Sequence, residues 1–316
     1  AEGDLCEDYR LEIENKLVIP TMGRVERFID VFEFLMKLSM ERPLTLFIDE
    51  FQEFFRVNKS VYSDMQRIWD LYSPKSRINL IVCGSIYSMM SKIFKDKKEP
   101  LYGRQTRFMT VRPFTPAVLK EILTECNPGY TAEDLLALYS FTGGVAKYVQ
   151  LLMDVRATTR EKMLNQIVKA DSIFLGEGKA ILIEEFGKDY GVYFSILSAI
   201  ARGKTSRSEI ENVVGREVGG YLTKLENEYE VIAKKQPLFE KSSSKNVRYT
   251  IEDNFFTFWF RFIYKYSYML EIENYESLKT IINRDYETFS GLMLERYFRR
   301  VLIERKAYTR IGGWWD

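Results

Sequence analysis

Two short apolar runs, each ending in small or acidic polar residues, constrain the fold of this chain more than any other feature. The first, LTLFI at residues 44–48, has no polar face and precedes Asp49-Glu50, and the second, Ile78 to Cys83, ends at Gly84-Ser85. Such runs are typical of parallel strands covered on both sides. With a helix expected at about 60 to 72, they predict a right-handed βαβ unit and an α/β sheet.

Further elements are predicted on either side of this unit. An amphipathic pattern predicts a helix over 24–40, and Phe108 to Val111, closed by Arg112-Pro113, is compatible with a third strand. The chain has no initiator Met and ends on Trp314-Trp315-Asp316, which resembles the start of a strand. Both ends are therefore expected to be cut.

The second half of the sequence predicts helices and one hairpin. Thr115-Pro116 and the capping-box pattern Thr131-Ala-Glu-Asp134 indicate a helical subdomain over 115–155, with further helix to about 180. From Tyr190 three short helices are expected, the second opened by Ser206-x-x-Glu209 and the third near 216–229. Strands at 231–235 and 247–251 follow, and three helices plus a hairpin are typical of a winged helix.

Composition excludes several classes of chemistry. The 316 residues contain no histidine, so catalytic triads, Cys-His dyads and His-ligated metals are ruled out. Cys6, Cys83 and Cys126 are far apart and form no CxxC pair, so a reducing, cytoplasmic setting is expected. Because 46 Lys and Arg nearly balance 45 Asp and Glu, any nucleic-acid partner must bind a local basic patch.

No membrane span is predicted. The most apolar stretch, residues 255–270, is only 16 residues long and is interrupted by Arg261 and Lys265. Asp253-Asn254 supplies a helix cap just before it, so a buried aromatic helix is expected there.

The most specific chemical signal is the acidic pair at the end of the first strand. One carboxylate, Asp49, can hold Mg²⁺, and the next, Glu50, can orient and deprotonate a water aimed at a γ-phosphate. The alternative is that these acids merely face solvent. Ser85, at the end of the neighbouring strand, is a candidate sensor of the γ-phosphate, or alternatively the cap of a helix over 86–94.

Arg104 is the candidate for a positive charge on the phosphates. It lies in the loop Pro100-Leu-Tyr-Gly-Arg104, and a planar guanidinium suits a γ-phosphate, including one bound by a neighbouring subunit. The alternative is a surface salt bridge.

Together these motifs resemble the archaeal-type AAA+ (P-loop) ATPase family, in which an ATPase core is followed by a winged helix and a restriction-endonuclease-like domain. The resemblance rests on LFIDEFQEF, LIVCGSIYSMM, EPLYGR, FTGGVAKYVQLL and YTIEDNFFTFWFRF, in that order. It implies five regions: an ATPase α/β core without Walker A (1–114), a helical lid (115–182), a winged helix (183–254), an aromatic helical linker (255–280) and the start of a restriction-endonuclease-like domain (281–316).

The resemblance also implies binding of ATP and Mg²⁺, with Asp49 and Glu50 in the Walker B roles and Lys147 near a phosphate or exposed to solvent. A phosphate-binding loop G-x-x-x-x-G-K-[ST] should precede Walker B, yet no such string occurs. Gly203-Lys204-Thr205 lacks the first glycine and lies downstream of Walker B, so Gly203 is expected to end a helix. The loop is expected in a missing N-terminal segment, and this chain alone is expected to be inactive.

DNA binding is the second hypothesis, and homo-oligomers or a partner protein are further possible partners. The candidate contacts lie on the third helix and the hairpin of the winged helix: Arg216, Lys224, Lys234, Lys235, Lys245 and Arg248. The same helix carries four glutamates, which offset its charge. Glu295 matches an acid of the nuclease-like domain, whose other catalytic residues would lie beyond Asp316. The competing function is a DNA- or protein-binding regulator whose ATPase fold is only structural.

Overall fold

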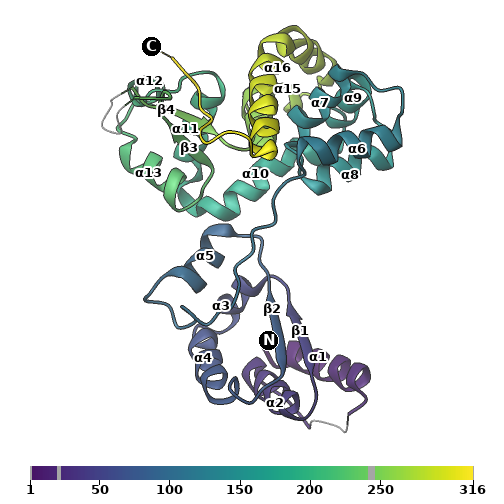
Figure 1. Ribbon diagram of the computed structural model, residues 1–316, viewed down its shortest axis with the longest axis vertical. Helices are drawn as coiled ribbons and strands as arrows, with labels where there is room; N and C mark the ends of the chain where they lie inside the picture. The colour runs from purple at the N-terminus through teal and green to yellow at the C-terminus, as the bar shows by residue number, and fades with distance from the viewer. Residues whose placement is uncertain (1, 20–22, 241–245, 316) are drawn as a thin grey trace. The chain divides into compact units, whose positions relative to one another are not determined.

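The computed structural model describes residues 2–19, 23–240 and 246–315, apart from the side chains of Glu2 and Leu5. It divides into two compact units, residues 1–109 and 110–316 (Figure 1).

The first unit is built on the two predicted strands. β1 (Leu44–Ile48) and β2 (Ile78–Val82) pair in parallel, with Ile48 opposite Val82. Around them lie α1 (Glu2–Leu17), α2 (Phe28–Glu41), η1 (Phe51–Glu53), α3 (Phe54–Val57), α4 (Val61–Tyr72) and α5 (Tyr87–Lys95). The predicted βαβ order is confirmed, and α4 is the longest of the helical elements between the two strands (Figure 1).

Burial of the sheet differs from the prediction. Leu44, Leu46 and Leu80 pack on a core formed with α2 and α4, but alternate residues face away from it. Phe47 is 58% exposed and Ile81 is 43% exposed. The expectation that both faces are covered is therefore wrong for the described residues, because the helices of this unit cover one face only.

Two further strand predictions are also wrong. Residues 108–114 and 314–315 form no strand, although both segments contain β-favouring side chains. A strand needs a hydrogen-bonded neighbour, and β1 pairs only with β2 among the described strands. Val111 is accordingly almost fully exposed.

The second unit begins with the predicted helical region. It contains α6 (Pro116–Cys126), α7 (Ala132–Thr142), α8 (Ala146–Asp154), α9 (Arg160–Ile167) and α10 (Ile173–Phe186). Thr115 caps α6, and Thr131 and Asp134 form the predicted capping box of α7. Gly143 ends α7 in the left-handed region, and a side chain at Gly144 would collide with the Phe114 carbonyl at 2.4 Å. The Gly-Gly pair thus has a structural role.

The predicted three helices and hairpin follow, and after η2 (Gly187–Asp189) they are α11 (Tyr190–Ala201), α12 (Arg207–Val214), α13 (Gly219–Asn227), β3 (Ile232–Lys235) and β4 (Arg248–Ile251). The strands are antiparallel, and Ser206 and Glu209 form the expected capping box. α13 begins at Gly219, so Arg216 precedes the helix on which it was predicted. Gly203 lies just after α11, as expected.

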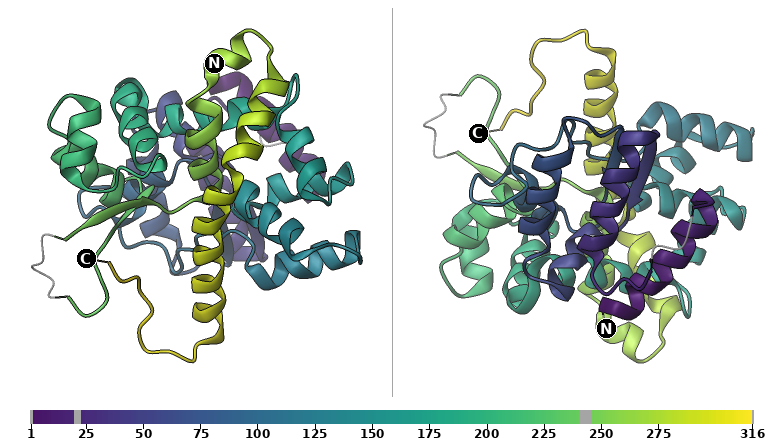
Figure 2. Two further views of the ribbon diagram at one scale, coloured as in Figure 1. Left: turned by 90° about the horizontal axis from the view of Figure 1, so that it is seen from above. Right: turned by 90° about the horizontal axis from the view of Figure 1, so that it is seen from below.

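The aromatic segment is buried but is not one helix. It divides into α14 (Asn254–Phe258), a π-helical stretch η3 (Trp259–Tyr264) and α15 (Ser267–Glu271), before the 31-residue α16 (Tyr275–Arg305). Asp253 caps α14 as predicted. The long α16 packs on α6 and α7 (Figure 2), and none of the helices in the described residues is long and apolar enough to cross a membrane.

Candidate functional site

The carboxyl ends of β1 and β2 bring three of the predicted site residues together. The strands are parallel and in register, so Asp49-Glu50 and Cys83-Gly84-Ser85 leave the same edge of the sheet side by side (Figure 1). Backbone bonds continue this pairing, from the Cys83 N–H to the Ile48 carbonyl and from the Phe51 N–H to the Cys83 carbonyl, both at 2.9 Å. We call Asp49, Glu50, Gln52, Cys83 and Ser85 the strand-end cluster.

Asp49 is an exposed carboxylate, and hydrogen bonds hold one of its two oxygens in place. Its Oδ1 accepts hydrogen bonds from the Cys83 thiol at 2.7 Å and from the Glu50 N–H at 2.9 Å. These two donors, the thiol first, lower the pKa of Asp49. Burial and the neighbouring Asp49 raise the pKa of Cys83 to about 11. At neutral pH the site therefore holds a charged carboxylate beside an uncharged thiol.

Glu50 is held in a strained backbone conformation. Its φ of 48° and ψ of 44° lie in the left-handed region, which costs a residue with a Cβ roughly 1–2 kcal/mol. Its Oε2 accepts from the Gln52 amide and from the Ser85 hydroxyl, the latter at 2.8 Å, and these bonds lower its pKa. Strain of this kind, when it is observed, is more frequent at functional sites than elsewhere.

Ser85 does not cap the helix that follows it, which was the alternative to a role as γ-phosphate sensor. Residue Ile86 occupies the cap position of α5, and no side chain there bonds the helix terminus. The Ser85 hydroxyl and, at 3.4 Å, its backbone N–H both point to Glu50 instead. The two residues that were predicted separately are therefore in direct contact.

Arg104 and Lys147 are both paired with other acids. Arg104 donates two hydrogen bonds to Asp70, at 2.8 and 2.7 Å, which is the surface salt bridge of the alternative interpretation. Lys147 donates to Glu177 at 2.8 Å on the second unit. Neither side chain contacts the strand-end cluster in the described hydrogen bonds, so their roles toward a phosphate stay predictions.

Sequence analysis missed Gln52 and Cys83. Gln52 is only 1% exposed, although it is polar and lies two residues after an exposed acidic pair. Its position in LFIDEFQEF gave no sign of burial, because that burial depends on Gly84, 32 residues later. The signal for Cys83 was available, since it ends the second strand beside Asp49.

The donor set fits a magnesium ion shared with phosphates. Within the described residues no group of three or more His, Cys, Asp or Glu side chains could hold a metal by itself. Mg²⁺ is usually bound through one or two carboxylates together with waters and substrate phosphates. Asp49, exposed and charged at the edge of the sheet, matches that requirement.

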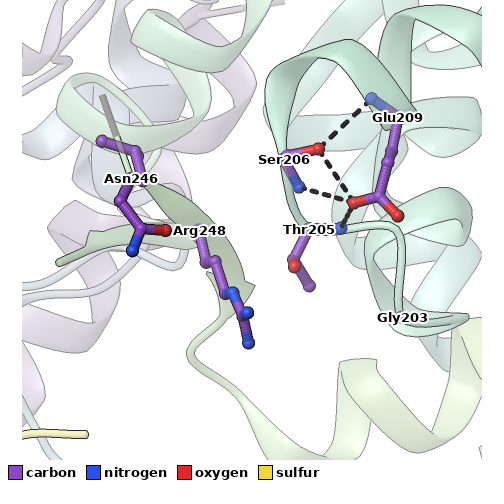
Figure 3. Close-up of a pocket in the computed structure, with 7 residues that line it drawn as sticks. Gly203, Thr205, Ser206, Glu209, Asn246 and Arg248 are labelled. Atoms are coloured by element: carbon purple, nitrogen blue, oxygen red, sulfur yellow. Dashed lines mark hydrogen bonds between the residues drawn. The ribbon is translucent and has the colours of Figure 1, made fainter. Parts of the chain in front are cut away.

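The predicted DNA contacts surround the β3–β4 hairpin. Lys235 is paired with Glu252 at 2.7 Å, and the Arg248 guanidinium lies 5.0 Å from the Trp315 ring. Arg248 also lines an open cavity of about 420 Å³ with Thr205, Ser206 and Asn246, in which Glu209 binds the start of α12 (Figure 3). Lys234 lines a second hollow beside Glu226 and Glu230.

Several of these basic side chains therefore lie beside carboxylates, which offset their positive charge. Arg216 and Lys224 are exposed. Lys245 lies outside the described residues.

Comparison with known proteins supports the fold. A family model described as "Archaea bacterial proteins of unknown function" (DUF234) matches residues 259–316. The chain is 31% identical to the uncharacterized protein MJECL04 of Methanocaldococcus jannaschii over 281 residues, which are 85% of this chain and 61% of that protein. Uncharacterized protein MJ0424 of the same organism is 33% identical over 57 residues, 18% of this chain and 55% of MJ0424. The chain thus spans about three fifths of MJECL04.

A solved structure gives the architecture. The Walker-type ATPase PABY2304 of Pyrococcus abyssi superposes with a TM-score of 0.61 and 20% sequence identity, covering 82% of this chain and 79% of that one. The chain shares the fold of that ATPase. The strand-end cluster is the part of this fold where the sequence predicted nucleotide chemistry.

Proposed function

We propose that this protein is a Mg²⁺-dependent ATPase and that the strand-end cluster is the metal- and water-binding half of its site. The observation that carries the proposal is the convergence of Asp49, Glu50 and Ser85 at the ends of two paired parallel strands, with the Ser85 hydroxyl 2.8 Å from Glu50. Ligands in open α/β sheets bind at the carboxyl ends of the strands.

Each residue has a distinct role in the proposal. Asp49 holds Mg²⁺, which when bound neutralises charge on the phosphates. Glu50 accepts a hydrogen bond from the attacking water and takes its proton. Ser85 fixes the Glu50 carboxylate and contacts the γ-phosphate. The phosphate-binding loop, which the 316 residues do not contain, is proposed to come from another segment of the full-length protein.

The finer parts of the proposal concern the second unit. Its three helices and hairpin are proposed to be a winged helix, and residues 281–316 the start of a nuclease-like domain, with hydrolysis repositioning this C-terminal module. Arg104 would reach a neighbouring subunit's phosphate only after leaving Asp70, and Lys147 only after leaving Glu177. We propose a cytoplasmic location.

Direct DNA binding is the alternative, and the exposed Arg248 beside the open cavity favours it. The paired Lys235 and the glutamates near Lys234 weaken it, because they offset phosphate attraction. Retention on DNA that falls steeply with salt and is unaffected by nucleotide would support this alternative over the ATPase switch.

The ATPase proposal is tested by steady-state hydrolysis in the full-length protein. Glu50→Gln keeps the shape of the side chain and removes the base, so kcat is expected to fall about 10²- to 10⁴-fold while ATP still binds. Asp49→Asn is expected to weaken Mg²⁺ binding, so that hydrolysis falls and needs a higher Mg²⁺ concentration. The matched control is Glu53→Gln, which alters a nearby half-exposed acid paired with Arg56 and should leave kcat unchanged. Full activity in Glu50→Gln would show that the acids are structural.

A further inference from the structure

The side-chain amide of Gln52 is buried, and among the described residues only its nitrogen forms hydrogen bonds. It is 1% exposed, and its Nε2 donates to Glu50 Oε2 and approaches the Ser85 hydroxyl at 3.5 Å. Its Oε1 is buried and has no hydrogen-bond partner within the described part of the chain. An unpaired buried carbonyl is destabilising, and an apolar side chain of similar size would avoid that cost. Such a group in a native structure needs an explanation.

The surrounding structure holds the Gln52 amide in one place. The Tyr62 hydroxyl donates to the backbone carbonyls of Phe51 and Gln52, at 3.0 and 3.3 Å. A Cβ added at Gly84 would lie 2.0 Å from Gln52 Oε1 and 2.7 Å from the Met90 sulfur. Position 84 therefore accommodates the Gln52 amide because it has no side chain.

The direction of the amide follows from charge. Glu50 is a carboxylate, so Gln52 must turn its N–H toward it, since Oε1 in that place would repel the acceptor. This bond and the two from Ser85 all reach Glu50 Oε2. No hydrogen bond between described residues reaches Glu50 Oε1, which leaves that oxygen available as an acceptor.

We propose that Gln52 is a positioning residue for ATP hydrolysis: its amide N–H fixes Glu50 Oε2 so that Oε1 faces the attacking water. This inference rests on the proposed ATPase function and assigns a residue to it. Gln52 acts through Glu50 and, being buried, does not touch the nucleotide. Fixed orientation matters because misplacing a catalytic group by about 1 Å can lower a rate roughly 100-fold.

The test uses Gln52→Met in the full-length protein. Methionine fills similar space and removes both the N–H and the unpaired carbonyl, so thermal stability should not fall. We expect kcat for ATP to fall about 10- to 100-fold with KM changed less than about twofold. Gln52→Asn, which keeps an amide but withdraws it by one methylene, should lower kcat in the same way and serves if the first variant fails to fold.

A matched control exists in the same unit. Gln105 also has a buried, unpaired Oε1, and its Nε2 donates to the Phe94 carbonyl at 3.1 Å instead of to a carboxylate. Gln105→Met should leave kcat unchanged. An equal fall in Gln105→Met, or an unchanged or increased kcat in Gln52→Met, would overturn the inference.

Failure of the inference and failure of the proposed function are separable. If the unmodified protein hydrolyses ATP and Glu50→Gln does not, an unaffected Gln52→Met removes only the role of Gln52. If the unmodified protein shows no Mg²⁺-dependent hydrolysis, the proposed function fails and the role of Gln52 fails with it.

Discussion

The strand-end cluster of the first unit differs instructively from a polar cluster buried in the second. The latter, which we call the cap cluster, consists of Asp253, Asn254, Thr257 and Arg296. Arg296 donates to Asn254 at 3.1 Å and to Thr257 at 3.2 Å, and Asp253 accepts the Phe256 N–H at 2.9 Å. Both clusters combine an acid, an amide and a hydroxyl.

The pKa values of the acids shift in opposite directions in the two clusters. Burial raises the pKa of Asp253, whereas hydrogen-bond donors lower the pKa of Asp49 and of Glu50. Burial also lowers the pKa of Arg296. The cap cluster directs its polar atoms to the ends of helices, while the strand-end cluster keeps charged oxygens at an exposed edge and accepts backbone strain at Glu50. Polar composition alone therefore does not identify a functional site. What distinguishes the strand-end cluster is that its carboxylate oxygens remain available to bind a ligand.

The largest expected effect tests whether the cap cluster is structural. Arg296→Met leaves the Asn254 and Thr257 oxygens without the guanidinium that donates to them, so we expect a loss of about 2–4 kcal/mol in the free energy of unfolding. Denaturant unfolding followed by circular dichroism measures it. Arg299→Met, on the same helix in a partly exposed pair with Glu295, should cost less than about 1 kcal/mol. Equal losses would place the cap cluster outside the core of the unit.

A smaller effect is expected at the capping box of α7. Burial alone would raise the pKa of Asp134, but the N–H groups of Thr131 and Arg160 outweigh it, and the pKa is lowered. Asp134→Asn should therefore cost about 1–2 kcal/mol at pH 7.

The sign of its pH dependence follows from this lowered pKa. The stabilisation is fully present above the ordinary value of 3.8 and is lost as the pH falls through the lower folded value. Unfolding curves of both proteins at neutral and acidic pH measure it. A gap that widens on acidification would contradict the assignment, and Glu133→Gln, an exposed neighbour, serves as the control.

The smallest change in stability, below about 1 kcal/mol, is expected for Cys83→Ser, which keeps a donor for Asp49. The informative measurement is alkylation of the unmodified protein at pH 8. With its pKa raised to about 11, Cys83 should react about 100-fold more slowly than an ordinary thiol of pKa ~8.5. Exposed Cys126 gives the reference rate in the same sample. Faster labelling of Cys83 in Asp49→Asn would sharpen the assignment, and equal rates at both cysteines would contradict it.

Sequence reasoning succeeded where a local pattern decides the structure. Apolar patterns predicted the strands β1 and β2 and the hairpin. Capping residues predicted the helix starts at Thr115 and Ser206. Parallel pairing then places Ser85 near Glu50, because neighbouring strand ends share one edge.

It failed where a residue's environment is set by distant parts of the chain. The partner of Arg104 is Asp70, and Gln52 is buried against Gly84. Neither contact can be predicted from the local sequence. The strand expected at 108–111 lacks a neighbour, which no local pattern can reveal.

The left-handed backbone of Glu50 has a consequence for protein engineering. Glycine and asparagine tolerate this conformation better than glutamate, so selection for thermal stability alone should favour them at position 50. Selection for turnover should restore the acid. Under the proposed ATPase function, position 50 is thus a site where directed evolution for robustness and directed evolution for activity would diverge, and a stabilised Glu50→Gly protein would serve as an inert scaffold for capturing nucleotide-bound states.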